Sequence, residues 1–245
     1  MTTFTDLFHR HIAASVDKQA TLNEMRQRWT DYSFDTQRGK LIMSKNASAP
    51  DMMFDIQVLG SESADEVWQW AWANPGNIPA RLVETAMHMR DFGQQENIPE
   101  FANPQLQIQR TGFLTGATLA GVTCCMHNSL AYFPVPYNNA NLFLLLTTQV
   151  PQKFQENPIT RMAHIFPQLT SGPWAVPDFK RAFEGYAAYY SLEFMREGDH
   201  VIASHPQYGV ITATFNDYNR LINIDAKAVE NKPSTGLASK FLKKG

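Results

Sequence analysis

Three tryptophans at alternate positions are the residues of this chain best suited to holding a ligand. Trp68, Trp70 and Trp72 recur every second residue, and Asn74 follows at the same spacing. Side chains of a β-strand alternate between its two faces, so this spacing predicts one face of three indoles ending in an amide. Indoles stack on sugars, nucleobases and other aromatic ligands. The alternative is architectural, because large aromatic side chains usually pack in the core.

The segment Cys124-Cys125-Met126-His127-Asn128 combines a potential nucleophile with a potential base. Cysteine catalysis needs a thiol close to a base and to an orienting group. On a helix, Cys125 and His127 would point in nearly opposite directions, whereas Cys124 shares a face with His127 and with Asn128. A cysteine in an apolar helix is more often an inert packing residue. Cysteine-dependent hydrolysis is therefore a hypothesis that competes with simple packing.

Histidine spacing gives no metal site. Glu84 and His88 are four residues apart, so they could pair or share a metal, but two ligands do not make a site. His9 and His11 are two residues apart on the first predicted helix and therefore lie on different faces. A solvated helix face explains the polar stripe formed by Arg81, Glu84, Thr85, His88 and Asp91. Nucleotide-binding glycine loops and hydrolase elbows are also absent from the sequence, so we expect no metal and no cofactor.

From residue 111 to 152 the chain contains no Asp, Glu, Lys or Arg. Polar residues and prolines interrupt this stretch too often for a membrane span, so it predicts buried core. Around Pro134 and Pro136 we expect a loop that contains Tyr132 and Tyr137. Such a loop could rim a pocket for a small neutral ligand, although its Asn and Pro residues are also ordinary turn formers.

Composition excludes several classes of protein. The 245 residues are 44% apolar and 12% aromatic, which is enough for a substantial core. A net charge of -2 argues against a dedicated nucleic-acid binder and against electrostatic docking on a membrane. The two cysteines are neighbours in sequence, which disulfide geometry disfavours, and the N-terminus has no apolar signal-peptide core. We therefore expect a reduced, cytoplasmic setting.

Hydrophobic periodicity predicts an α+β protein in which antiparallel sheet packs against long helices. Residues 3–29 predict one long helix or two joined near residue 18, and 114–128 predicts a buried central helix. Further helices are expected over 79–93, 158–166 and 178–190. Strands are expected over 52–59, 68–74, 106–108, 142–148, 192–195, 201–204, 210–215 and 221–224. Residues 1–229 would form a single domain, followed by a mobile polar tail over 230–245.

A short echo within the chain suggests two similar lobes, 1–110 and 111–229. Tyr32-Ser33, Gly39, Ile42 and Ser44 follow the first helix, and Tyr190-Ser191, Gly198, Ile202 and Ser204 follow a later helix in the same order. A helix followed by an antiparallel meander, used twice, would explain the match. Coincidence is the alternative, because short matches of this kind are common.

The segment Gln57-Val58-Leu59-Gly60-Ser61, followed by residues 68–74, resembles a motif of bacterial proteins classed as a domain of unknown function. In that motif a Leu-Gly strand end and a polar loop precede Trp-x-Trp-Ala-Trp-x-Asn. The resemblance covers about residues 54–76. It implies a bacterial source and no known activity, so it transfers no catalytic residue to this chain.

Three functions are compatible with the sequence. The first is a non-catalytic binding or interaction protein with an unknown protein partner, such as one that neutralises a toxin or defends against phage. The second is a binder of a small neutral or aromatic ligand through the tryptophan face and the uncharged stretch. The third is the cysteine-dependent hydrolase. We favour the first because the sequence contains no recognisable catalytic constellation.

Overall fold

The computed structural model describes residues 2–27, 29, 31–44, 51–73, 76, 78–137, 139–148 and 156–229. Asn74 and the tail predicted over 230–245 lie outside these residues. The helices are α1 (Phe4–Arg26), η1 (Ala80–Leu82), α2 (Glu84–Glu96), α3 (Pro99–Ala102), α4 (Gly116–Met126), α5 (Pro158–Ile165), η3 (Phe166–Thr170) and α6 (Phe179–Tyr189). The strands of the first sheet are β1 (Asp31–Asp35), β2 (Lys40–Ser44), β3 (Met52–Ser63), β4 (Val67–Trp70), β5 (Gln105–Gln107), β6 (Ala131–Tyr137) and β7 (Ala140–Leu146). The strands of the second sheet are β8 (Glu193–Glu197), β9 (His200–His205), β10 (Gly209–Phe215) and β11 (Leu221–Ala228).

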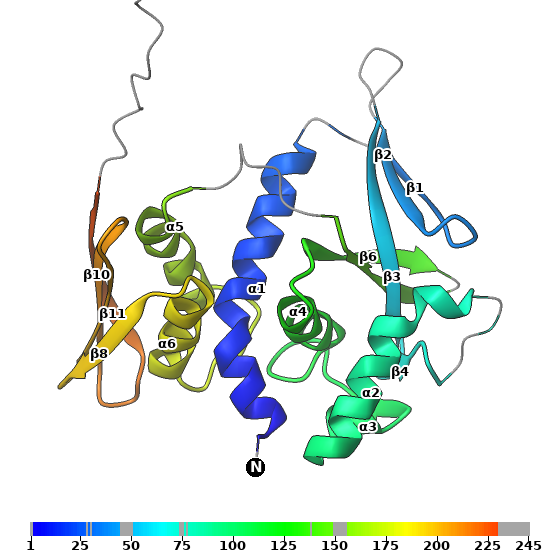
Figure 1. Cartoon of the computed structure of the whole chain (residues 1–245). Coiled ribbons are helices and arrows are strands. Elements are labelled where there is room, and N and C mark those ends of the chain that lie inside the picture. The colour runs from blue at the N-terminus through cyan, green and yellow to red at the C-terminus, as the bar shows by residue number, and fades with distance from the viewer. Residues whose placement is uncertain are drawn as a thin grey trace, which may run out of the picture.

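Helix α1 stands between the two antiparallel sheets (Figure 1). On one side of it lie α4 and the curled seven-stranded sheet, with α2 and α3 packed beside them. On the other side lie α5 and α6, which are covered by the sheet of β8 to β11. The α+β class predicted from periodicity is confirmed. Helix α4 is buried as predicted, but the helix at the centre of the molecule is α1.

Helix α1 is one continuous helix of 23 residues, not two. A capping box starts it, in which the Thr3 hydroxyl accepts from the Asp6 amide while the Asp6 carboxylate accepts from the Thr3 amide. Its buried residues occur on every side of the helix and include the charged pair Asp17 and Lys18. A helix covered on all sides belongs to the core. From here on, the N-terminal lobe means the first sheet with α2 to α4, and the C-terminal lobe means α5, α6 and the second sheet. Helix α1 is the element on which both lobes are assembled.

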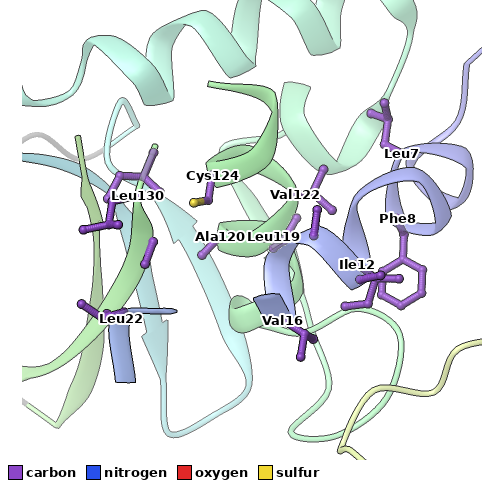
Figure 2. Packing of buried hydrophobic residues seen from close by; sticks show 14 of the residues in the cluster. Leu7, Phe8, Ile12, Val16, Leu22, Leu119, Ala120, Val122, Cys124 and Leu130 are labelled. Carbon is purple, nitrogen blue, oxygen red and sulfur yellow. The ribbon is translucent and has the colours of Figure 1, made fainter. Parts of the chain in front are cut away.

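Two glycines allow other helices to approach α1 closely. A Cβ on Gly121 of α4 would overlap the Ser15 hydroxyl, and a Cβ on Gly185 of α6 would lie 2.5 Å from the Arg10 Cα. Side chains of α1 and α4 interlock beside the first of these contacts (Figure 2). Because these glycines lack a Cβ, the backbones of α4 and α6 can lie directly against α1, on opposite sides of it.

Strand β4 is shorter than the alternating tryptophans predict. It pairs antiparallel with β3, placing Trp68 opposite Glu62 and Trp70 opposite Gly60. The strand ends at Trp70, and Trp72 lies in the turn that follows. The continuous strand predicted over 68–74 is therefore wrong at residues 71–73, which form a turn.

A β-bulge changes which face of β3 is paired with these tryptophans. Against β7, Val58 pairs with Leu144 but Gly60 pairs with Phe143, so Leu59 is an extra residue. Leu144 and Phe143 are neighbours and point to opposite faces, so the alternation of β3 reverses at the bulge. The apolar face that starts at Phe54 therefore lies on the opposite side of the sheet from the β4 tryptophans, although simple alternation predicts one shared side.

The predicted loop around Pro134 and Pro136 is strand β6. It pairs with β7 through residues 131–137 and has no second neighbour among the described strands, so it is an edge strand. Proline cannot donate to a sheet ladder but is tolerated at an edge, where its nitrogen faces away from the neighbouring strand. The loop prediction is wrong because proline interrupts a strand only where its nitrogen would have to donate to a neighbouring strand.

A helix followed by an antiparallel meander occurs twice in the fold. Helix α1 precedes β1 to β4, and α6 precedes β8 to β11. Gly39 and Gly198 occupy equivalent turns after the first strand, both with positive φ. The two tyrosines of the repeated pattern do not occupy equivalent positions, because Tyr32 lies in β1 whereas Tyr190 caps α6. An origin by duplication stays a prediction.

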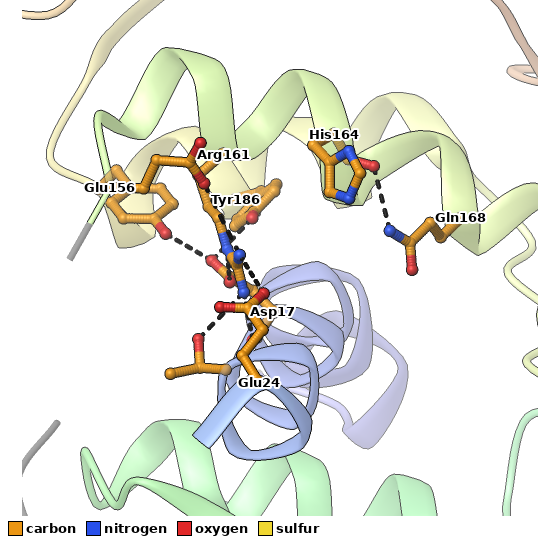
Figure 3. Close-up of polar contacts among 9 residues, drawn as sticks. Asp17, Glu24, Glu156, Arg161, His164, Gln168 and Tyr186 are labelled. Atoms are coloured by element: carbon orange, nitrogen blue, oxygen red, sulfur yellow. Dashed lines mark hydrogen bonds and ion pairs between the residues drawn. The ribbon is translucent and has the colours of Figure 1, made fainter. Parts of the chain in front are cut away.

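A buried ionic cluster fixes α1 to α5 and α6 (Figure 3). Arg161 of α5 donates from Nε to the Asp17 carboxylate at 2.6 Å and from Nη1 to Glu24 at 2.6 Å. The hydroxyls of Tyr186 and Tyr190 donate to the other Asp17 oxygen at 2.8 and 2.5 Å. Burial and the Asp17 charge raise the pKa of both tyrosines, so their hydroxyls remain protonated donors.

Lys18 extends toward the opposite lobe. Its Nζ donates to the Ser129 carbonyl at 2.6 Å, just before β6, and lies 5.5 Å from the centre of the Tyr189 ring. Asp17 and Lys18 are neighbours on α1, yet each is satisfied mainly by a different lobe. Both are buried, so each charge depends on that lobe being in place.

Replacing Arg161 by Met tests how much the cluster contributes to folding. The change leaves the buried Asp17 carboxylate without a positive partner, so we expect a loss of about 3–5 kcal/mol in the free energy of unfolding. Arg38→Met is the matched control, because its pair with Asp35 is largely exposed and such pairs contribute about 1 kcal/mol or less. Urea denaturation measures both variants, and equal losses would contradict a structural role for the cluster.

Candidate functional site

A cleft of about 400 Å³ opens where α1, α6 and β8 meet. Asp6, His9 and Arg10 come from the first half of α1, while Glu184 comes from α6 and Phe194 from β8. Its position follows from the close approach of α1 and α6 at Gly185, which also lines the cleft. The site therefore exists only where the N-terminal helix meets the C-terminal lobe.

His9 is a buried histidine in the wall of this cleft. Its side chain is 3% exposed, and neither ring nitrogen makes a well-formed hydrogen bond within the described residues. Burial lowers the pKa of His9, as does the nearby Arg181 guanidinium, and the opposing effects of the Asp178 carboxylate, the Thr5 carbonyl and the Asp6 carboxylate are smaller. The ring is therefore neutral at pH 7, with one donor and one acceptor nitrogen.

Most charges of the cleft are compensated within it. Arg181 donates to the Asp6 carboxylate at 2.6 Å, which, with the Thr3 hydrogen bonds, holds the pKa of Asp6 well below its usual range. Glu184 is bound by the guanidinium of Arg196 through two hydrogen bonds of 2.5 and 2.6 Å. Among the described residues Arg10 has no such partner, and its side chain is exposed at the rim.

This arrangement is suited to binding an organic anion. Arg10 offers a planar set of donors, and such groups bind carboxylates with charge-assisted hydrogen bonds. His9 offers a further donor or acceptor deeper in the cleft. Ala188 and Phe194 supply apolar surface, and the Phe194 side chain is 44% exposed.

The two tryptophans of β4 are core residues. Trp68 and Trp70 are 0% exposed, and their rings pack edge to face at 5.3 Å. Trp68 also contacts Phe143, while the Trp70 indole donates to the Glu100 carbonyl at 3.0 Å. Neither ring offers a surface on which a ligand could stack in this structure.

The other predicted ligand-binding residues are dispersed. Trp72 is partly buried beneath the Arg90 guanidinium, 5.7 Å from its ring centre. Tyr132 packs against the core, while Tyr137, on the same strand, is 54% exposed. Asn74 lies outside the described residues. The structure therefore does not gather the predicted set around one pocket.

The cysteines do not form a catalytic pair with a histidine. The Cys124 thiol faces the Ser129 carbonyl at 3.5 Å, and the Cys125 thiol faces the His11 carbonyl at 3.7 Å. Burial raises the pKa of Cys124 to about 12 and raises that of Cys125 well above its usual value. Both thiols are therefore protonated at neutral pH, which removes the nucleophile that a hydrolase would need.

Four residues of the predicted polar stripe are exposed, as a solvated face would be, whereas Thr85 is buried and Arg81 lies in η1, just before α2. His88 stacks on His127 at the end of α4, with ring centres 6.0 Å apart and planes at 11°. Burial, followed by the nearby His88, lowers the pKa of His127. Over the residues that the structure describes, no three His, Cys, Asp or Glu side chains are grouped as metal ligands.

Sequence reasoning did not identify the cleft. His9 was visible only as a histidine on the first helix, and Arg10, Arg181 and Phe194 belong to no motif. The capping box at Thr3 indicated where α1 begins, but nothing local indicated that α6 and β8 would close against it. The nearest available signal was the unusual density of polar residues on a helix that is otherwise apolar.

A family model for the Family of unknown function (DUF6882) matches residues 5–149. The matched segment begins in α1 and ends just after β7, so it includes the first sheet but neither α6 nor β8. No curated protein and no solved structure matches the chain. None of the described helices has the length and apolarity needed to cross a membrane.

Thiol reactivity tests the protonated state of the cysteines. We expect Cys124 and Cys125 to react with iodoacetamide at pH 7 far more slowly in the native protein than in urea, because the native thiols are buried and hold their protons. Mass spectrometry after timed labelling gives both rates. Rapid native labelling of either thiol would contradict this and restore the hydrolase hypothesis.

The partly buried His11 predicts a loss of stability in mild acid. Burial, followed by the neighbouring Arg10 charge, lowers the pKa of His11 to about 4, whereas an unfolded histidine titrates near 6.5. Between these values the unfolded chain binds the proton and the folded chain does not, so stability falls as the pH drops from about 6.5 to 4. We expect His11→Phe to remove up to about 3 kcal/mol of this fall.

Urea denaturation at several pH values measures the effect. The exposed His164 provides the matched control, because His164→Gln changes a histidine at the surface. The control should keep the pH dependence of the wild type. If His11→Phe keeps it as well, protonation of His11 does not limit stability in acid.

Proposed function

Since the chain belongs to a family of unknown function, DUF6882, we propose its function from its geometry: it is a non-catalytic binding protein that holds an organic carboxylate in the cleft between α1, α6 and β8. The observation that supports this most directly is the buried His9 ring, which has only a poorly formed contact with the Thr5 carbonyl and lies beside Arg10, an arginine with no ionic partner among the described residues. The cleft also lies within the usual size range of ligand sites, about 300–1,000 Å³.

His9 supports a ligand-binding role on energetic grounds. A buried polar group without a hydrogen-bond partner destabilises a protein by about 1–3 kcal/mol. A ligand that supplies the missing partner recovers this free energy once the ring turns toward the cleft, because neither ring nitrogen is accessible in the free protein. Such a ligand would also exclude water from the Arg10 guanidinium and so strengthen the ionic contact there.

The neighbouring carboxylates favour a singly charged ligand. Asp6 and Glu184 both line the cleft, so a doubly charged phosphate would meet more repulsion than a carboxylate. The exposed ring of Phe194 favours a ligand with an apolar part next to the charged group. Together these features support an organic carboxylate over a phosphate or an inorganic ion.

Binding is favoured over catalysis because neither His9 nor the two cysteines form a nucleophile–base pair. His9 has no nucleophile among its hydrogen-bond contacts in the described chain. The thiols of Cys124 and Cys125 are buried and protonated. Two unpaired, reduced cysteines also support the cytoplasmic location that the composition suggests.

Phenylacetate and its neutral analogue phenylacetamide test the proposal. We expect phenylacetate to bind with a Kd of about 1 mM, as befits a small ligand with one good ionic contact, and phenylacetamide to bind at least about tenfold more weakly. Arg10→Gln should weaken phenylacetate binding by about tenfold or more, since charge-assisted hydrogen bonds contribute about 1.5–3 kcal/mol. Titration followed by NMR measures these affinities and locates the affected residues.

Two further variants make the result decisive. His9→Phe retains an aromatic ring but lacks ring nitrogens, so it should weaken binding without loss of folding stability. Arg38→Gln changes an exposed arginine of the first sheet and should bind like the wild type. Equal affinity for acid and amide, or no effect of Arg10→Gln, would refute the proposed carboxylate site.

A further inference from the structure

We propose that the carboxylate in the cleft belongs to an acidic side chain of an extended partner segment, which adds as a new strand to the free edge of β8. This inference rests on the proposed function and names the kind of partner that the cleft receives. A protein segment is favoured over a free acid by the free backbone edge of β8, by the position of that edge beside the cleft and by the charged residues on the outer face of β8.

The backbone of β8 is available on one side. The second sheet has the order β11, β10, β9, β8, and only β9 pairs with β8 among the described strands. All five residues of β8 are exposed, including Phe194 and Met195 at 44% and 58%. An edge strand presents alternate N–H and C=O groups to which an extended peptide can bond.

The free edge lies beside the cleft. Phe194 of β8 lines the cleft together with His9 and Arg10 of α1, so a strand added next to β8 would lie beside the cleft. The side chains of Phe194 and Arg196 face the helices, as the Arg196 bond to Glu184 shows. Alternate side chains of an added strand would therefore enter the cleft, where Arg10 is available for an acidic one.

The outer face of β8 determines which strand fits. Glu193, Met195 and Glu197 share this face because they alternate with Phe194 and Arg196. Two copies of β8 paired antiparallel around Met195 would place Glu193 opposite Glu197, and like charges opposed across strands are destabilising. A partner segment with basic residues at those positions is favoured instead. Short, charged edges resist indiscriminate pairing, so complementary charge confers selectivity.

A seven-residue peptide, acetylated and amidated, tests the inference on the full chain. In the sequence Thr-Lys-Val-Thr-Asp-Lys-Thr, the lysines match the spacing of Glu193 and Glu197, and Asp lies on the face toward the cleft. We expect it to bind at least tenfold more tightly than phenylacetate and to slow hydrogen exchange of the β8 amides at least tenfold. Replacing Asp by Asn in the peptide should weaken binding about tenfold, and so should Arg10→Gln in the protein.

A peptide of the same sequence with N-methyl groups on alternate amides is the control for strand addition, because it lacks the donors that would bond β8. It should bind no more tightly than phenylacetate. If phenylacetate binds but the unmodified peptide gains neither affinity nor β8 protection, the partner inference fails and the proposed function stands. If neither binds, both fail.

The free protein offers a further test. We expect the β8 amides that do not bond β9 to exchange rapidly in the full chain without peptide. Slow exchange that does not depend on protein concentration would mean that another part of this chain occupies the edge. Slow exchange that grows with concentration would mean that a second copy does. Either outcome would overturn the inference.

Discussion

The structure depends on satisfying two opposite charges that are neighbours on a buried helix. Asp17 and Lys18 of α1 are both nearly inaccessible, and an unpaired charge in such a place is strongly destabilising. The Arg161 guanidinium and two tyrosine hydroxyls satisfy Asp17 from the C-terminal lobe. The Ser129 carbonyl satisfies Lys18 from the side of the first sheet. Both lobes must therefore dock on α1 in one register.

That docking is what creates the cleft. The ionic cluster fixes α6 against the middle of α1, and Gly185 allows the helices to meet at Arg10. Near the N-terminus of α1, beside the Asp6–Arg181 ion pair, the buried His9 lines the cleft. Under the proposed function, a polar residue that would be destabilising in a closed core becomes a ligand-binding residue at the edge of the core. The cleft thus results from the docking of both lobes on α1.

The features that the sequence predicts correctly are those set by interactions between residues close together in the chain. The α+β class, most helices and the meander after α6 follow from periodicity, and the Thr3 capping box marks the start of α1. The loop predicted around Pro134 is a strand, because a proline that breaks a central strand is tolerated in an edge strand. The bulge at Leu59 was invisible because it depends on β7. His9 and Phe194 meet only through tertiary packing, so no local pattern could place them in one site.

Sharing α1 between lobes also sets the order in which the protein can be completed during synthesis. Asp17 and Arg161 are 144 residues apart, a separation that typically slows folding. At about 5–20 residues per second, a ribosome needs roughly 7–30 s to add that stretch. During this time the DUF6882 segment can emerge with α1 covered on one side only. The nascent helix then exposes a carboxylate and an apolar face, which makes it a target for chaperones until α5 and α6 arrive.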